Sequence, residues 1–141
     1  MSVEIYKSVT KESKGFPYFT TSVSAGQPCA VEEHRNEWLD LNDYLVEHPA
    51  DTFFVRVQGE SMLNAGIHDG DLLIVDRAKP IRNNAIVVAY LNGDCTVKRI
   101  RKENEMLLLV PENPEFSPIP VTADMQFDVF GVVTNVIHAV S

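Results

Sequence analysis

The sequence has little cysteine, little positive charge and no long apolar run, and each shortage excludes a class of protein. Its two cysteines, Cys29 and Cys95, are too few and too far apart for a zinc motif or a CxxC redox motif, so we interpret them as small packing residues. Twelve Lys and Arg stand against 20 Asp and Glu, a net charge of −8, which argues against a broad basic face for nucleic acid. No stretch approaches the roughly 20 apolar residues of a membrane span.

The N-terminal part of the chain also lacks regular patterning. Residues 1–5 show neither the basic segment nor the apolar segment of a signal peptide, so we expect a cytoplasmic protein. Residues 1–31 follow neither a helical nor a strand period and are rich in Ser, Thr, Gly and Pro. We therefore predict an extended N-terminal arm over residues 1–31 and one compact domain over residues 32–141.

What is present beyond the arm is mainly strand-like. A short helix is expected from about Glu37 to Glu47, capped by Asn36 and packed against the core. Short apolar runs separated by turn signals follow, among them Asn92-Gly93, which is typical of a hairpin. A long loop is expected where four prolines cluster between residues 111 and 120. The pattern predicts a mainly β fold, a compact antiparallel domain with a half-barrel or orthogonal-sheet core and one short helix.

The stretch Gly59-Glu60-Ser61-Met62 carries the clearest chemical signal. Ser61 follows a predicted strand and a turn glycine, and Lys98 lies in a later strand-like run. A serine needs a base to become a nucleophile, and a lysine can serve if burial keeps its amine neutral. Ser61 and Lys98 are therefore candidate catalytic residues of a serine–lysine dyad. From periodicity alone, an ordinary turn serine and a strand lysine reaching water remain open as the alternative.

Several short motifs, in this order and spacing, resemble those of the LexA-type self-cleaving serine–lysine peptidases, and in particular their UmuD branch of translesion-polymerase accessory subunits. The resemblance runs from about Phe16 to the C-terminus. The matching pieces are Phe16-Pro17, Ala25-Gly26, Asp40-Leu41-Asn42, His48-Pro49, Phe54-Val55, Gly59-Glu60-Ser61-Met62, Gly66-Ile67, Asp69-Gly70-Asp71-Leu72-Leu73-Ile74-Val75-Asp76, Thr96-Val97-Lys98 and Phe127-Asp128-Val129-Phe130-Gly131-Val132-Val133.

The resemblance implies a specific function, which composition alone does not indicate. Ser61 would be the nucleophile, Lys98 the general base and Ala25-Gly26 the self-cleavage bond, with no cofactor and no metal. The implied partners are a RecA–single-stranded-DNA filament that stimulates cleavage in the DNA-damage (SOS) response, a UmuC-like polymerase catalytic subunit, and a second copy in a homodimer. Residues 1–31 are too short and irregular for a helix-turn-helix, so no sequence-specific DNA binding is expected.

Two other functions remain open at this point: a phage-type self-cleaving repressor fragment, and a non-enzymatic β interaction module. The UmuD branch has a cysteine where this chain has Ala25, and a small residue still suits a tight acyl pocket. The apolar run at residues 127–133 suggests a dimer independently, if it forms an open sheet edge where two copies pair.

Overall fold

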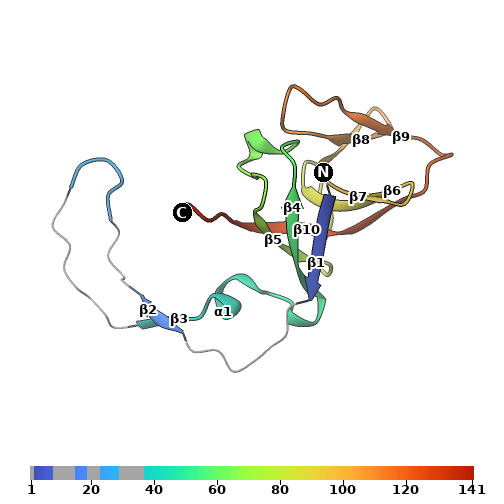
Figure 1. The fold of residues 1–141 in the computed structure, drawn as a ribbon. Helices are drawn as coiled ribbons and strands as arrows, with labels where there is room; N and C mark the ends of the chain where they lie inside the picture. The colour runs from blue at the N-terminus through green and yellow to red at the C-terminus, as the bar shows by residue number, and fades with distance from the viewer. Residues whose placement is uncertain (1, 8–14, 19–22, 29–36) are drawn as a thin grey trace. The chain divides into compact units, whose positions relative to one another are not determined.

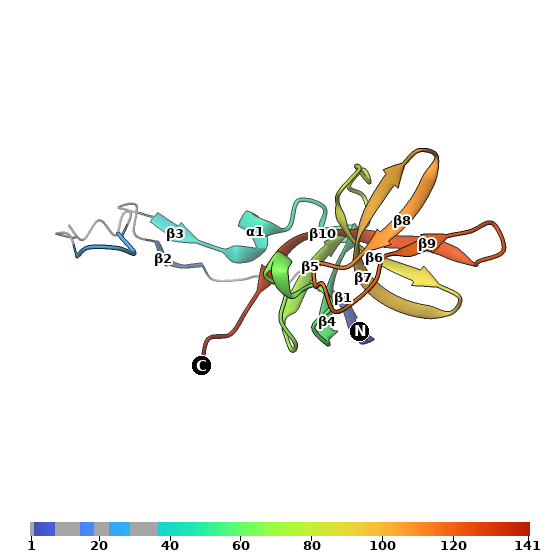
Figure 2. The same ribbon diagram turned by 90° about the horizontal axis from the view of Figure 1, so that it is seen from above.

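A computed structural model describes residues 2–7, 15–18, 23–28 and 37–141. Its main feature is one eight-stranded antiparallel sheet with the strand order β1-β4-β5-β10-β6-β7-β8-β9. The strands are β1 (Ser2–Lys7), β4 (Thr52–Gln58), β5 (Leu72–Asp76), β6 (Ile86–Leu91), β7 (Asp94–Glu103), β8 (Met106–Val110), β9 (Ile119–Val121) and β10 (Phe127–Ile137). The sheet curls into a half-barrel, as Figures 1 and 2 show, which confirms the predicted fold class.

The long strand β10 joins the two halves of this curled sheet. Its first part, from Phe127, pairs with β6, and its last part, to Ile137, pairs with β5. Register shifts between Val129 and Gly131, and again after Val133, let the strand bend. The sheet therefore packs a core on each face. One core gathers around Met62 and the other around Leu109, and both of these side chains are fully buried.

This position of β10 corrects one expectation. We expected the apolar run at residues 127–133 to form an open edge, but β10 lies between β5 and β6, and the edges are β1 and β9. Within the run, residues 127–132 pair with β6, Val132 and Val133 pair with β5, and Phe130 and Val132 are buried in the two cores. The run therefore gives no independent argument for a homodimer.

The predicted hairpin is confirmed. Leu91 pairs with Asp94, so Asn92 and Gly93 form a two-residue turn, and both have positive φ, at 50° and 86°. The loop predicted at residues 111–120 was only partly right, because it ends in the strand β9. Pro120 pairs there with Leu108. A proline is tolerated because β9 is an edge strand of the described sheet, and an edge strand can do without one ladder amide.

The segment before the sheet differs from the expected helix. Residues Glu37–Leu39 form strand β3, which pairs with β2 (Phe16–Tyr18), and the helix α1 is only Leu41–Leu45. Its N-cap is Asp40, whose carboxylate accepts from the Asn42 N–H; the predicted cap, Asn36, lies outside the described residues. The expected packing of this helix against the core stays a prediction.

The chain divides into two compact units, residues 1–8 with 48–141, and residues 9–47. Strand β1 belongs to the first unit, where Ser2–Lys7 pairs with β4. The start of the predicted arm is therefore a sheet strand, while the division at residues 31 and 32 stays a prediction. Among the described residues, no helix is long and apolar enough to cross a membrane.

Candidate active site

Ser61 lies in a tight loop directly after β4. Gly59 has a φ of 104°, a conformation that favours glycine, and its N–H donates to a carboxylate oxygen of Asp69 at 2.7 Å. The next side chain, Met62, is fully buried and anchors the loop in the core. The sequence therefore turns the chain sharply after the strand and fixes Ser61 at the turn.

A second segment holds this loop from the other side. The Glu112 N–H donates to the carbonyl of Ser61 at 2.9 Å, and the Glu112 carbonyl accepts from the Asn64 N–H at 2.7 Å. The side-chain amide of Asn113 donates to the Glu60 carbonyl at 2.8 Å. Ser61 is consequently only 1% exposed, with its main chain held on both sides. A nucleophile held in this way loses little freedom when it reacts.

Lys98 reaches the serine from the middle of β7. Its Nζ lies 3.1 Å from the Ser61 Oγ, and the residue is 5% exposed. Burial lowers the pKa of the Lys98 amine, because removal from water disfavours the charged form. Within the part of the chain that the structure describes, no carboxylate forms an ion pair with Lys98 to offset this effect.

Two further oxygens surround the Lys98 amine. Its Nζ donates to the Thr96 Oγ1 at 2.7 Å and to the Val97 carbonyl at 3.1 Å. A neutral amine has two N–H bonds and one lone pair. If the two N–H bonds point to Thr96 and Val97, the lone pair is left to accept from the Ser61 hydroxyl. The arrangement thus suits a neutral lysine that takes a proton from Ser61.

Thr96 is a site residue that the sequence analysis did not identify. It stands two positions before Lys98, so the two side chains share a strand face. That shared face was visible in the sequence, but which atom the amine would touch was not. The neighbouring Arg99 donates to the Glu112 carboxylate at 2.5 Å and is partly buried.

The loop also offers main-chain donors for a developing oxyanion. The N–H of Gly59 is used by Asp69, which removes it from this role. Among the residues that the structure describes, the N–H groups of Glu60 and Ser61 donate to no other group. Donors of this kind, fixed beside a nucleophile, stabilise the charge of a tetrahedral intermediate.

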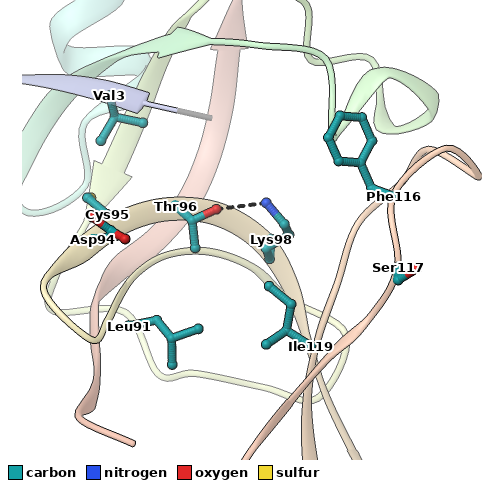
Figure 3. Close-up of a pocket in the computed structure, with 9 residues that line it drawn as sticks. All are labelled: Val3, Leu91, Asp94, Cys95, Thr96, Lys98, Phe116, Ser117 and Ile119. Carbon is teal, nitrogen blue, oxygen red and sulfur yellow. Dashed lines mark hydrogen bonds between the residues drawn. The ribbon is translucent and has the colours of Figure 1, made fainter.

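A cleft of about 570 Å³ opens beside the lysine (Figure 3). Its walls include Val3 from β1, Phe116 and Ile119 from the segment before and within β9, and Thr96 and Lys98 from β7. The walls combine apolar and polar side chains, and a bound peptide segment would exclude water from the amine. The cleft is large enough for several residues of an extended chain.

The predicted cleavage bond lies in the other compact unit. Ala25 and Gly26 form part of an exposed bend over residues 25–27, where the Gly26 N–H donates to the Ser24 Oγ at 3.3 Å. The structure thus brings Ser61 and Lys98 together and describes Ala25 and Gly26 separately. Of the two cysteines, Cys95 is half-buried and burial raises the pKa of its thiol, while Cys29 lies outside the described residues.

The family model and the similar proteins agree on one family for this chain. Residues 17–134 match the Peptidase S24-like family, whose members are serine peptidases. The chain is 42% identical to Protein SamA of Salmonella typhimurium over 122 residues, which cover 86% of this chain and 84% of that protein. It is also 42% identical to Protein ImpA of Escherichia coli, over 86% of this chain and 83% of that protein.

Repressors are also among the relatives. The LexA repressor of Colwellia psychrerythraea is 39% identical over 129 residues, covering 91% of this chain and 60% of the repressor. The alignment thus takes in nearly all of this chain but only part of the repressor. The resemblance seen in the sequence motifs is confirmed.

Proposed function

This chain belongs to the Peptidase S24-like family, and on that premise we propose that it is an autoprotease that cleaves its own Ala25–Gly26 bond. Ser61 is the proposed nucleophile and Lys98 the general base. The observation that carries the proposal is the 3.1 Å separation of the Lys98 Nζ and the Ser61 Oγ, with both side chains buried.

The reaction proceeds in two halves. The neutral Lys98 amine takes the proton of the Ser61 hydroxyl, and the Oγ bonds to the carbonyl carbon of Ala25. The resulting ammonium gives this proton to the Gly26 nitrogen as the C–N bond breaks, which leaves Ala25 as an ester on Ser61. Water, deprotonated by the same amine, then attacks the ester and releases the Ala25 carboxylate with Ser61 restored.

The substrate's attachment to the enzyme favours this chemistry. A bond carried on the same chain, or on an associated copy, is present at a high effective concentration, so a slow dyad suffices. Regulation then acts on how Ala25 and Gly26 are presented to Ser61. A RecA–single-stranded-DNA filament, proposed from the family resemblance, would act by stabilising the cleavable arrangement.

The proposed setting is the cytoplasm of a cell responding to DNA damage. The cleaved product, from Gly26 onward, would serve as the accessory subunit of an error-prone translesion polymerase and bind its UmuC-like catalytic subunit. We also propose a homodimer, which now rests on the resemblance alone because β10 is an interior strand. Sedimentation at micromolar concentration tests it, and a monomer mass would contradict it.

The cleavage assignment is tested by mass spectrometry after alkaline incubation of the purified chain. The proposal expects a fragment whose first residue is Gly26. A matched variant, Ala25→Asp, places a charged side chain before the bond and should block cleavage without altering Ser61 or Lys98. A fragment beginning at any other residue, or normal cleavage of Ala25→Asp, would contradict the assigned bond.

A further inference from the structure

The end of β10 places a histidine beside a buried aspartate. In the β5–β10 pair, Ile137 stands opposite Leu72, so the next residue, His138, comes level with Asp71. The Nδ1 of His138 lies 2.5 Å from the Asp71 Oδ1. Asp71 is only 3% exposed, while the His138 side chain is 44% exposed. One imidazole thus covers a buried carboxylate from the solvent side.

A turn before β5 brings a second histidine to the same carboxylate. The N–H of His68 donates to the Asp71 Oδ2 at 2.7 Å, and the Asp71 N–H donates back to the His68 carbonyl at 3.1 Å. Main-chain bonds of Gly70 and Asp71 with Val57 tie this turn to β4. The turn is therefore rigid, and it holds the His68 Nδ1 at 3.7 Å from the Asp71 Oδ2.

The three side chains converge on one point. Their candidate ligand atoms all lie within 4.8 Å of one another, and the two rings are 4.6 Å apart between centroids, tilted by 34°. In a tetrahedral zinc site, bonds of about 2.0–2.2 Å set ligand atoms roughly 3.4 Å apart. The His68 Nδ1 lies 3.7 Å from the Asp71 Oδ2, which is close to this value. The His138 Nδ1 lies 2.5 Å from the other oxygen, Oδ1, and would move away by about 1 Å to make room for the ion.

We propose that His68, Asp71 and His138 form a binding site for a divalent transition metal, with zinc as the representative ion. Two imidazole nitrogens and one carboxylate oxygen are a donor set that suits zinc and its neighbours rather than calcium or magnesium. The two half-exposed rings leave room for water as the fourth ligand. The site uses neither Ser61 nor Lys98.

A bound ion would have a structural consequence. It would fasten the segment after β10 to the turn before β5, which are 67 positions apart in the sequence at Asp71 and His138. Because the ion binds the folded chain, it raises stability by mass action. The site therefore makes the C-terminal end of the chain respond to the supply of metal, independently of whether the chain cleaves itself.

Calorimetric titration of the full chain with zinc, after removal of metal by EDTA, tests the site. The protein carries no histidine tag, and Cys29→Ser and Cys95→Ser are introduced because thiols also bind zinc. The proposal expects one zinc ion per chain at micromolar concentration. His68→Gln and His138→Gln should each weaken binding at least about tenfold, since each removes a ligand.

The matched control is His48→Gln. The Nδ1 of His48 also contacts a buried carboxylate, that of Asp76, at 2.6 Å, but no second imidazole is within reach of that carboxylate among the described residues. This variant should keep wild-type affinity. Excess zinc should raise the melting temperature by about 5 °C in the wild type and in His48→Gln, and not in His68→Gln or His138→Gln.

Two results would overturn the site. One is the absence of saturable zinc binding to the chain in which His68, Asp71 and His138 are all intact. The other is equal affinity in the wild type, His68→Gln and His138→Gln, which would show that the imidazoles only hydrogen-bond Asp71. Melting temperatures in EDTA establish that each variant is folded before its affinity is compared.

Discussion

The Nζ of Lys98 lies 3.1 Å from the Oγ of Ser61, although the two residues are 37 positions apart in the sequence. The contact joins a loop after β4 to the middle of β7, and both side chains are buried. No carboxylate of the described residues pairs with Lys98, and a buried lysine in that setting is costly to keep charged, so this contact favours a neutral amine beside a hydroxyl. The predictions below follow from that relationship and from the packing around it.

Thr96 is expected to position the lysine. Replacing it by valine removes the hydroxyl 2.7 Å from the Lys98 Nζ while keeping a similar shape. The amine then loses one acceptor and is held less firmly toward Ser61, so the limiting cleavage rate at alkaline pH should fall about tenfold. Thr96→Ser keeps the hydroxyl and should restore most of the rate. Equal rates for Thr96→Val and the wild type would remove Thr96 from the mechanism.

Lys98 should also shape the pH dependence of stability. Burial holds its pKa in the folded chain below the ordinary value, near about 10.4, that it recovers on unfolding. Between these two pKa values the unfolded chain binds more protons, so the free energy of unfolding rises with pH.

Below the pKa of Lys98 in the folded chain, the buried ammonium lowers the free energy of unfolding by its full amount. The substitution Lys98→Met removes this destabilisation. The variant should therefore be more stable than the wild type at neutral pH, with the difference shrinking at alkaline pH. Urea unfolding measures this, with Ser61→Ala in both chains to prevent cleavage. A difference that stays constant or grows with rising pH would contradict the lowered pKa.

Gly131 should be intolerant of a side chain. A Cβ at this position would lie 2.7 Å from the Cγ1 of Val75 and 3.2 Å from the carbonyl of Asp76, in the crowded contact of β10 with β5. Gly131→Ala should cost about 1–3 kcal/mol in denaturant unfolding, because the buried Val75 has little room to move. Gly26→Ala, where the nearest atom is 3.9 Å away, is the control and should leave stability unchanged.

The proposed homodimer predicts that one chain can cleave another. Mixing Ser61→Ala chains, which keep a good bond, with Ala25→Asp chains, which keep the nucleophile, tests this directly. Cleavage of the Ser61→Ala chain in the mixture is the expected result, since subunits of a dimer exchange or present their segments to each other. If that chain stays intact at all concentrations, cleavage is confined to the chain that carries the bond.

The sequence predicted the meeting of Ser61 and Lys98 better than the contacts around them. A turn glycine, a strand end and a strand face marked Ser61 and Lys98 as candidates, and the resemblance to LexA-type peptidases favoured them as a pair. The amine's contacts with Thr96 and Val97 depend on where the side chain ends, which periodicity does not specify. The group around Asp71 could not be predicted for a similar reason, because His68 and His138 meet only through the register of β5 and β10.

The fold prediction failed where pairing between strands that are distant in the sequence determines the structure. The apolar run of β10 was correctly predicted as a strand, but its place between β5 and β6 depends on the whole sheet. Residues Glu37–Leu39 carried a helical spacing and instead pair with β2. Pairing between strands overrides local propensity in such short segments. The sheet itself was predictable because its turns, such as Asn92-Gly93, are specified locally.

The most direct test of the serine–lysine mechanism is the rate of self-cleavage as a function of pH. The rate should rise about tenfold per pH unit below the lowered pKa of Lys98 and then level off, because only the neutral amine can take the Ser61 proton. Ser61→Ala and Lys98→Ala should each slow cleavage by at least about a thousandfold at every pH. A rate that is flat or falls toward alkaline pH, or wild-type cleavage by the Lys98→Ala chain, would contradict the account.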